Sequence, residues 1–241
     1  MGTRGDILGL SLIGRAQYSR LMNVLAIDTS TSACSAALLL RDGRVAAHRL
    51  TVMARGQSEA LMPMVKAVLD EAGLTIAELD LLAVTVGPGA FTGLRIGLAA
   101  ARGFALASGL PLAGVPTPLA VAAAIPEAER VGRTVVVALD SKRDHPWIQF
   151  FRSDLTPLGA VEALAPDEVS ARLTGPVLVA GDAGARLLAV LPDAVAASSP
   201  GWPDAVFVAR LGAELWREGR AWPPEPLYLR APDVTLPGSK S

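Results

Sequence analysis

Two apolar segments that each end in an aspartate constrain the fold of this chain more than any other feature. Val24–Asp28 (VLAID) and Thr134–Asp140 (TVVVALD) are both typical of short buried strands, and further strand patterns follow each of them. The first series reads strand, strand, strand, helix, strand, helix, and the second is a degraded repetition of it. We therefore predict a duplicated α/β fold with two lobes.

The first half carries the stronger local signals. Asp42-Gly43 separates two strand patterns and predicts a tight hairpin. Thr75 and Glu78 have the spacing of a capping box for a short helical turn. We expect strands at Val24–Asp28, Cys34–Leu40, Arg44–Val52 and Leu81–Val86, and helices at Ser58–Ala72 and from about Thr92 to Ser108.

The second half is shorter, and we expect it to lack a full set of strands. Prolines between Pro111 and Pro118 mark the boundary between the halves. We predict a first lobe over 22–125, a reduced second lobe over 126–222 that includes a helix at Asp204–Glu218, and a Pro-rich tail over 223–241. Residues 1–21 precede the first strand, and we interpret them as an extension that is disordered or not native.

Composition excludes several classes of protein. Hydrophobic residues make up 51% of the chain, which is enough for a core and too much for a disordered protein. The net charge of −1 argues against independent binding of nucleic acid, because phosphate neutralisation supplies most of that affinity. The single cysteine, Cys34, is compatible with a reducing cytoplasm. The longest uncharged stretch, Gly103–Pro126, is broken by prolines and predicts no membrane span.

The duplicated pattern resembles the actin/Hsp70/sugar-kinase superfamily, in which two such lobes flank a nucleotide cleft. By that resemblance Asp28, Thr29 and Ser30 would be a vestigial phosphate loop, and Gly181 would stand near an adenosine. The turn after Asp28 contains no glycine, however, so we favour a purely structural Ser/Thr turn. Asp182 interrupts the expected Gly-Gly pair, and the hairpin after Asp140 has no glycine either. These weakened elements argue against strong ATP hydrolysis by this chain alone.

The segment Val84–Gly97 (VTVGPGAFTGLRIG) is the most informative stretch. Gly87 and Gly89 precede a helix whose first N–H groups could hold an anion. The helix is apolar nearly all round, so it must be buried, in its own lobe or against a partner. Its stripe of small residues, Gly93, Gly97 and Ala101, would let another helix approach closely, and we favour this interpretation.

Other enzyme classes leave no pattern in the sequence. The two histidines, His48 and His145, are not in metal-ligand spacing. The chain has no P-loop, no His-Glu-x-x-His motif and no Gly-x-Ser-x-Gly motif. We therefore expect no catalytic residues, no metal site and no strongly bound cofactor.

Four stretches together resemble the TsaB (YeaZ) family in order along the chain. They are LAIDTSTSACSAALL (25–39), GQSEALMP (56–63), LLAVTVGPGAFTGLRIGLAAARGFA (81–105) and PEPLYLR (224–230). The resemblance implies a non-catalytic, cytoplasmic subunit that dimerises with a TsaD-like catalytic subunit and works with a TsaE-like ATPase. The complex would transfer threonylcarbamoyl to the adenosine beside the anticodon of ANN-decoding tRNAs.

The resemblance also implies a surface for pairing on the helices that begin near Ser58 and Thr92. Alone, the chain would form a homodimer through the same surface. Whether ATP or ADP binds at the interface with TsaD stays open. Gln57 departs from the family, which usually has histidine there. The expected interface residues are Met62, Val65, Gly93, Leu94, Gly97, Ala101 and Phe104.

Two other functions stay open at this stage. The first is a small ATP-dependent kinase or ATPase of the same superfamily, which would show nucleotide binding that depends on Asp28. The second is a peptidase, and the sequence offers no nucleophile–base or metal pair for it.

Overall fold

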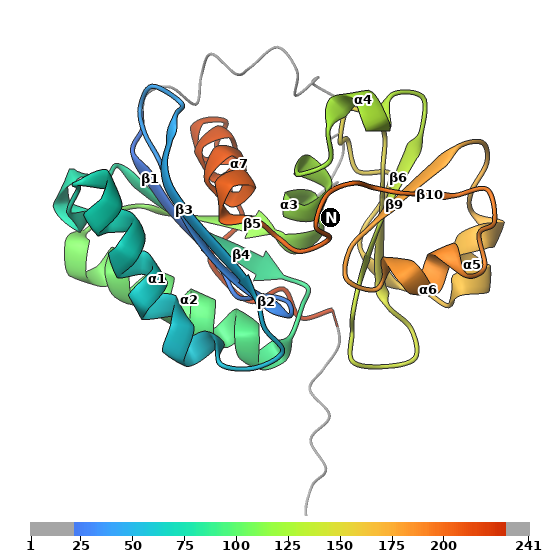
Figure 1. Cartoon of the computed structure of the whole chain (residues 1–241), viewed down its shortest axis with the longest axis horizontal. Helices are drawn as coiled ribbons and strands as arrows, with labels where there is room; N and C mark the ends of the chain where they lie inside the picture. The colour runs from blue at the N-terminus through green and yellow to red at the C-terminus, as the bar shows by residue number, and fades with distance from the viewer. Residues whose placement is uncertain (1–21, 230–241) are drawn as a thin grey trace, which may run out of the picture.

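The computed structural model describes residues 22–229, which form two α/β lobes (Figure 1). The first lobe is built on a five-stranded sheet of order β3-β2-β1-β4-β5, in which β1, β2 and β3 are antiparallel neighbours and β4 and β5 continue parallel to β1. Its strands are β1 (Val24–Asp28), β2 (Ala33–Leu39), β3 (Val45–Val52), β4 (Leu81–Gly87) and β5 (Leu112–Pro116). All four strands expected in this half are present. The fifth, β5, lies in the Pro111–Pro118 stretch that was expected to mark the boundary.

The second sheet repeats the topology of the first. Its order is β10-β9-β6-β7-β8, with β6 antiparallel to β7 and parallel to β9, so β6 takes the place of β1. The expected absence of a full set of strands is therefore wrong, because two edge strands are only two residues long and leave no periodic pattern in the sequence. The strands are β6 (Thr134–Leu139), β7 (Trp147–Phe151), β8 (Glu162–Ala163), β9 (Val177–Ala180) and β10 (Val195–Ala196).

Helices cover both faces of the first sheet. The helices α1 and α2 pack on one face, where Leu61, Val65 and Leu98 join the core, while α7 covers the opposite face (Figure 1). The short helix η2 (Ile76–Glu78) has the predicted capping box, with the Thr75 N–H donating to Glu78 Oε2 at 2.8 Å. The remaining helices are α1 (Gln57–Ala72), α2 (Phe91–Ser108), α3 (Thr117–Ala123), α4 (Glu127–Arg130), α5 (Pro166–Ala171), α6 (Gly184–Leu188) and α7 (Ala205–Arg217).

The last helix, α7, belongs to the first lobe, although the expected division assigned it to the second. Its buried residues, among them Val208, Ala209 and Ala213, form one cluster with Ala26 and Val115 of the first sheet. The approach is close, since a Cβ added at Gly212 would lie 2.6 Å from the Ala83 Cβ. The second lobe therefore ends before α7, and the chain crosses back to complete the first lobe.

The helix α3 joins the cores of the two lobes. Its residue Ala120 lies in the cluster formed by the first sheet and α7, whereas Val121 and Ala122 lie in the cluster of the second sheet. A single short helix thus contributes to both cores, and burial of its apolar residues couples the lobes.

The described part of the expected tail also runs along the first lobe. Trp222 pairs with Gly114 of β5 through two backbone hydrogen bonds of 2.9 and 3.1 Å. The Leu227 N–H donates to the Val86 carbonyl at 2.7 Å. The expectation about residues 1–21 lies outside the described residues. Between 22 and 229, no helix combines the length and apolar composition that a membrane crossing needs.

Candidate functional site

The turn after β1 is buried, and its polar groups bond within the chain. Asp28 has no exposed surface. Its Oδ1 accepts hydrogen bonds from the hydroxyls of Ser30 and Thr85, each at 2.6 Å, and from the Ser30 N–H at 3.1 Å. Its Oδ2 has no partner within residues 22–229. Burial raises the pKa of Asp28 to about 6, although these hydrogen bonds oppose the rise.

The glycine-rich loop and the start of α2 close over this turn. The Ala90 N–H donates to the Ser30 carbonyl at 2.7 Å, and the Thr29 hydroxyl donates to the Gly93 carbonyl at 2.6 Å. A Cβ at Gly89 or Gly93 would overlap the carbonyl oxygens of Ser30 and Thr29. The glycines are therefore explained by close approach between two parts of the same chain. The vestigial phosphate residues Asp28, Thr29, Ser30 and Gly89 come together: Ser30 donates to Asp28, Gly89 packs on Ser30, and Thr29 donates to Gly93.

Gly87 and Gly181 also have local structural roles. Gly87 has φ 112°, a left-handed value that favours glycine, and it lies against Leu94 and Leu227. Gly181 has φ 103°, and a Cβ there would overlap the Ala138 carbonyl of β6.

The strand ends of the second lobe are held by two aspartates. Asp182 Oδ1 accepts from the Asp140 N–H at 2.7 Å, and burial raises the pKa of Asp182. Burial would also raise the pKa of Asp140, but the hydrogen bonds and charge of Lys142 outweigh it and lower that pKa. Lys142 Nζ lies 2.7 Å from Asp140 Oδ2, so this cation of the hairpin has an anionic partner within the chain.

The residues expected at a partner interface are mostly internal. Five of the seven, namely Val65, Gly93, Leu94, Gly97 and Ala101, are buried in the chain's own lobe. Gly97 faces Thr29, whose hydroxyl oxygen would be 2.6 Å from an added Cβ. The small-residue stripe therefore packs against the β1 turn, which corrects its expected role in pairing with a second chain. Only Met62 is well exposed, at 50%, and Phe104 is half-buried.

The outer surface of α1 and α2 carries a different set of apolar residues. On α2, Leu106 is 89% exposed and Phe91 is 45% exposed, with the small residues Ala99 and Gly103 open to solvent between them. Met62 adds an exposed apolar side chain from α1. We call these five residues the outer apolar face. Of these, only Met62 is among the residues that the sequence indicates, because α2 has no polar side to show which of its residues point inward.

The C-terminal segment adds a cluster of aromatic and cationic groups beside this face. The Arg95 guanidinium lies 3.8 Å from the centre of the Phe91 ring, and its Nε donates to the Tyr228 hydroxyl at 3.1 Å. The Phe91 and Tyr228 rings are 5.6 Å apart, and Arg102 Nε donates to the Pro224 carbonyl at 2.8 Å. The PEPLY segment therefore packs along the outside of α2 from Phe91 to Arg102. The cluster that α2 and this segment form is rich in aromatic and arginine side chains, which is typical of interaction surfaces.

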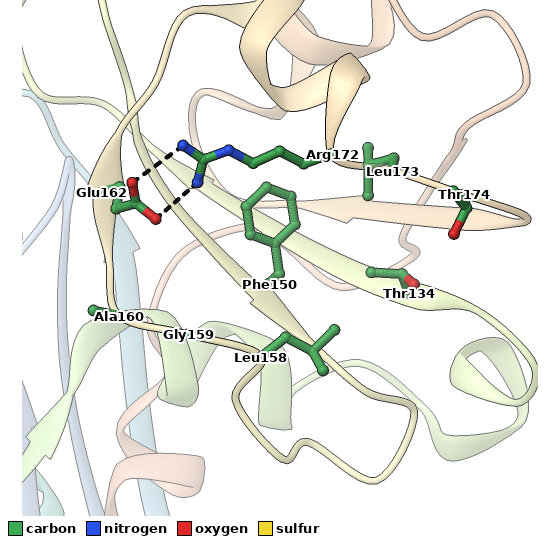
Figure 2. Close-up of a pocket in the computed structure, with 9 residues that line it drawn as sticks. All are labelled: Thr134, Phe150, Leu158, Gly159, Ala160, Glu162, Arg172, Leu173 and Thr174. Carbon is green, nitrogen blue, oxygen red and sulfur yellow. Dashed lines mark hydrogen bonds and ion pairs between the residues drawn. The ribbon is translucent and has the colours of Figure 1, made fainter. Parts of the chain in front are cut away.

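A pocket of about 260 Å³ lies in the second lobe and contains none of the expected site residues (Figure 2). Glu162 and Arg172 form a bidentate ion pair on one wall, with N–O distances of 2.8 and 3.2 Å. The pocket is lined by Thr134, Phe150, Leu158, Gly159, Ala160, Glu162, Arg172, Leu173 and Thr174. This described lining offers no nucleophile next to a general base, so it does not form a catalytic arrangement.

The described residues hold no group of three or more His, Cys, Asp or Glu side chains in a metal-binding arrangement. His48 Nε2 lies 3.0 Å from Asp204 Oδ1, which also accepts from the Val206 N–H at the start of α7. Gln57, the departure from the family pattern, donates from its side-chain amide to the Met53 carbonyl at 3.2 Å. The residues at 48 and 57 are thus explained by contacts within the lobe.

Two lobes with the same sheet order, joined through a shared core, define this protein as a member of the actin/Hsp70/sugar-kinase class of α/β folds. Comparisons with known proteins narrow the class. A family model described as "TsaD: tRNA N6-adenosine threonylcarbamoyltransferase" matches residues 51–153. The solved structure of YeaZ from Pseudomonas aeruginosa superposes with a TM-score of 0.73 at 30% identity, over 86% of this chain and 99% of that one.

Sequence relatives agree with the structural match. An uncharacterized protein of Mycobacterium tuberculosis is 38% identical over 224 residues, which are 92% of this chain and 97% of the relative. The tRNA threonylcarbamoyladenosine biosynthesis protein TsaB of Escherichia coli is 37% identical over 134 residues, 55% of this chain and 57% of that protein. The chain belongs to the TsaB (YeaZ) family.

Proposed function

We propose that this chain is a non-catalytic cytoplasmic subunit required for threonylcarbamoyl transfer to the adenosine beside the anticodon of ANN-decoding tRNAs. It acts by dimerising with a TsaD-like catalytic subunit and works with a TsaE-like ATPase. Relatives from Escherichia coli and Haemophilus influenzae are named for the biosynthesis of this modified nucleoside. Contact with tRNA is made through the complex.

The observation that carries the proposal is the outer apolar face on α1 and α2. Leu106, Phe91 and Met62 are each at least 45% exposed. Large apolar side chains that group on one surface of a soluble protein indicate an interaction site. Ala99 and Gly103 lie between Leu106 and Phe91 on α2, so a second helix could approach the α2 backbone closely. The same face would form a homodimer when the partner is absent.

The closed strand-end loops support a role without turnover. A phosphate loop must present free backbone N–H groups to its ligand. In this chain the Ala90 N–H at the start of α2 is bonded to Ser30, and Asp28 is shielded from solvent. These contacts argue against the kinase or ATPase alternative. ATP or ADP would instead be held at the interface with the catalytic subunit.

The test is reconstitution of tRNA modification with the TsaD-like and TsaE-like proteins of the same organism. With ATP and threonylcarbamoyl-adenylate supplied, modification should require this chain, and the chain alone should hydrolyse no ATP. Full modification in its absence would refute the proposal.

A matched pair of variants tests the surface. Leu106→Asp places a charge at the most exposed apolar side chain of the outer apolar face, and we expect it to weaken binding of the TsaD-like subunit by at least about tenfold, measured by calorimetry. Val131→Asp is the control, because Val131 is 67% exposed but lies in the second lobe. Equal affinity of both variants would place the interface elsewhere.

A further inference from the structure

The connection between β10 and α7 crosses from the second lobe to the first (Figure 1). At its start, the Ala197 N–H donates to the Val179 carbonyl at 2.8 Å, and the Ser198 N–H donates to Glu129 Oε2 at 3.0 Å. At its end, the Ala205 N–H donates to Ser35 Oγ of β2 at 2.9 Å. Both ends of this segment are therefore anchored, each in a different lobe.

Between its anchors the segment meets the strand-end loops of both lobes. Gly201 packs on Gly181, since a Cβ at Gly201 would lie 3.4 Å from the carbonyl carbon and oxygen of Gly181. At the other end Asp204 approaches Asp28, whose pKa is raised first by burial and further by the Asp204 charge. Asp28 and Gly181 are the positions where a nucleotide would be held if both lobes were functional. The segment packs on Gly181, and the charge of its Asp204 is close enough to Asp28 to raise the pKa of that carboxyl.

Individual polar atoms of the turn after β1 and of the connecting segment are buried, although Ser198 and Pro200 are themselves exposed. Within residues 22–229, several buried side-chain atoms have no hydrogen-bond partner, and four of them belong to the turn after β1 or to the connecting segment. Unpaired buried polar groups are costly, so ordered water is their simplest partner. The four atoms are Asp28 Oδ2, Thr31 Oγ1, Ser199 Oγ and Trp202 Nε1.

The sequence of the segment suits a rigid filler. Ser-Ser-Pro-Gly-Trp-Pro-Asp contains two prolines, which restrict the backbone, and a tryptophan, which fills volume. Pro203 is buried, and Gly201 has φ 79°, a left-handed value that favours glycine. A flexible linker would have a different composition, rich in glycine and serine without bulky residues.

We propose that Ser198–Asp204 is a built-in plug that occupies the space between the strand ends of the two lobes and locks the lobes at a fixed angle. The chain thereby carries its own substitute for a ligand between the lobes and does not open and close. This inference does not depend on the partner or the reaction proposed above, because it concerns contacts within one chain.

The test measures the distance between the lobes by electron spin resonance of two spin labels. Cysteines are introduced at Arg44 in the first lobe and Ser170 in the second, both exposed. Cys34 should stay unlabelled, because it is fully buried and burial raises its pKa to about 11. Dilution with unlabelled protein restricts the signal to distances within one chain.

We expect one narrow distance distribution in the otherwise unaltered chain, unchanged by magnesium and a non-hydrolysable ATP analogue. The double variant Trp202→Ser, Pro203→Ser, which removes the bulky side chains of the plug, should broaden the distance distribution. The matched control Trp216→Ser, at a tryptophan that is 42% exposed on α7, should leave it narrow. The proposal would be overturned if the double variant kept the same width of the distance distribution. A shift of the distribution when nucleotide is added to the protein with an unaltered plug would also overturn it.

Hydrogen exchange provides a second test. It uses the wild-type protein, so misfolding of a variant cannot affect the result. If the plug never opens locally, the Ala205 amide should exchange within about tenfold of the rate of core amides such as Val136, because both then need global unfolding. Exchange of Ala205 that is a hundred times faster or more would show that the plug opens independently and would also overturn the proposal.

Discussion

At the residue scale, a few glycines and one buried carboxylate determine how the first lobe closes. Gly89, Gly93 and Gly97 each face the Thr29–Ser30 turn, where no side chain would fit without displacing backbone or the Thr29 hydroxyl. Asp28 lies under that turn with no exposed surface. The motif GPGAFTGLRIG is therefore a packing motif in this chain, and its glycines can be tested one at a time.

Substitution of two glycines on the same helix should have opposite effects on stability. Gly93→Ala places a Cβ on the Thr29 carbonyl, and we expect a loss of about 3 kcal/mol in the free energy of unfolding. Gly103→Ala is the control, because nothing lies within 4 Å of its added Cβ, and alanine should stabilise α2 by about 0.5–1 kcal/mol. Urea denaturation measures both. Equal effects would mean that the Gly93 contact is not tight.

Asp28 should make stability depend on pH. Its pKa is raised from the model-peptide value of 3.8 to about 6, so the folded state binds the proton more tightly than the unfolded state does. Stability is then lost as pH rises from about 4 through about 6, and ionisation costs about 3 kcal/mol at pH 8.

Asp28→Asn removes that ionisation. Relative to wild type, the variant should gain about 2 kcal/mol of stability between pH 4 and pH 8, measured by urea denaturation at both values. The amide oxygen can still accept from the hydroxyls of Ser30 and Thr85. Burial of the amide NH₂ group changes the free energy of unfolding by the same amount at both pH values, so it does not affect the comparison. The expectation fails if the difference between variant and wild type does not change with pH.

At the scale of elements, the first sheet depends on a helix from the far end of the chain. The helix α7 covers the face formed by Ala26, Ala37 and Val115, and the strand-like pairing of Trp222 extends the edge at β5. Without these elements an apolar sheet face and a strand edge would be open to solvent, which favours aggregation.

A fragment of residues 22–125 should therefore not fold alone, although it contains all five strands of the first sheet. We expect poor chemical-shift dispersion and aggregation for this fragment, and recovery of dispersion when a peptide of residues 198–229 is added. A folded, monomeric fragment in the absence of the peptide would show that α7 is dispensable.

At the scale of the whole molecule, the two lobes share one core through α3. Ala120 packs with the first lobe, whereas Val121 and Ala122 pack with the second. The chain also crosses between the lobes in the opposite direction at the Ser198–Asp204 plug. Two independent crossings couple the lobes more strongly than a single linker would.

Thermal unfolding should accordingly be a single cooperative transition. Calorimetry should give equal calorimetric and van't Hoff enthalpies. Val121→Ala leaves a cavity in the core of the second lobe next to the junction, and it should lower the melting temperature without splitting the transition. Two resolved transitions in the wild-type protein would show that the lobes unfold independently.

The sequence alone determined the elements that depend on local chemistry. The Asp42-Gly43 hairpin, the Thr75–Glu78 capping box, the strands β1 to β4 and the strand β6 are where their patterns predict them. Turn chemistry and alternating or helical periodicity act over a few residues, so they can be read without knowledge of the fold. The motifs of the first lobe were also sufficient to predict the family.

Only the tertiary structure decided which surfaces meet. The helix α2 is apolar nearly all round, so its pattern could not show that Gly97 faces inward and Leu106 outward. The amphipathic pattern of α7 predicts one buried face but not the lobe that covers it. Strands of two residues, such as β8, have no period to detect. Local patterns encode burial, whereas the partner of each buried surface is set by contacts between residues far apart in the chain.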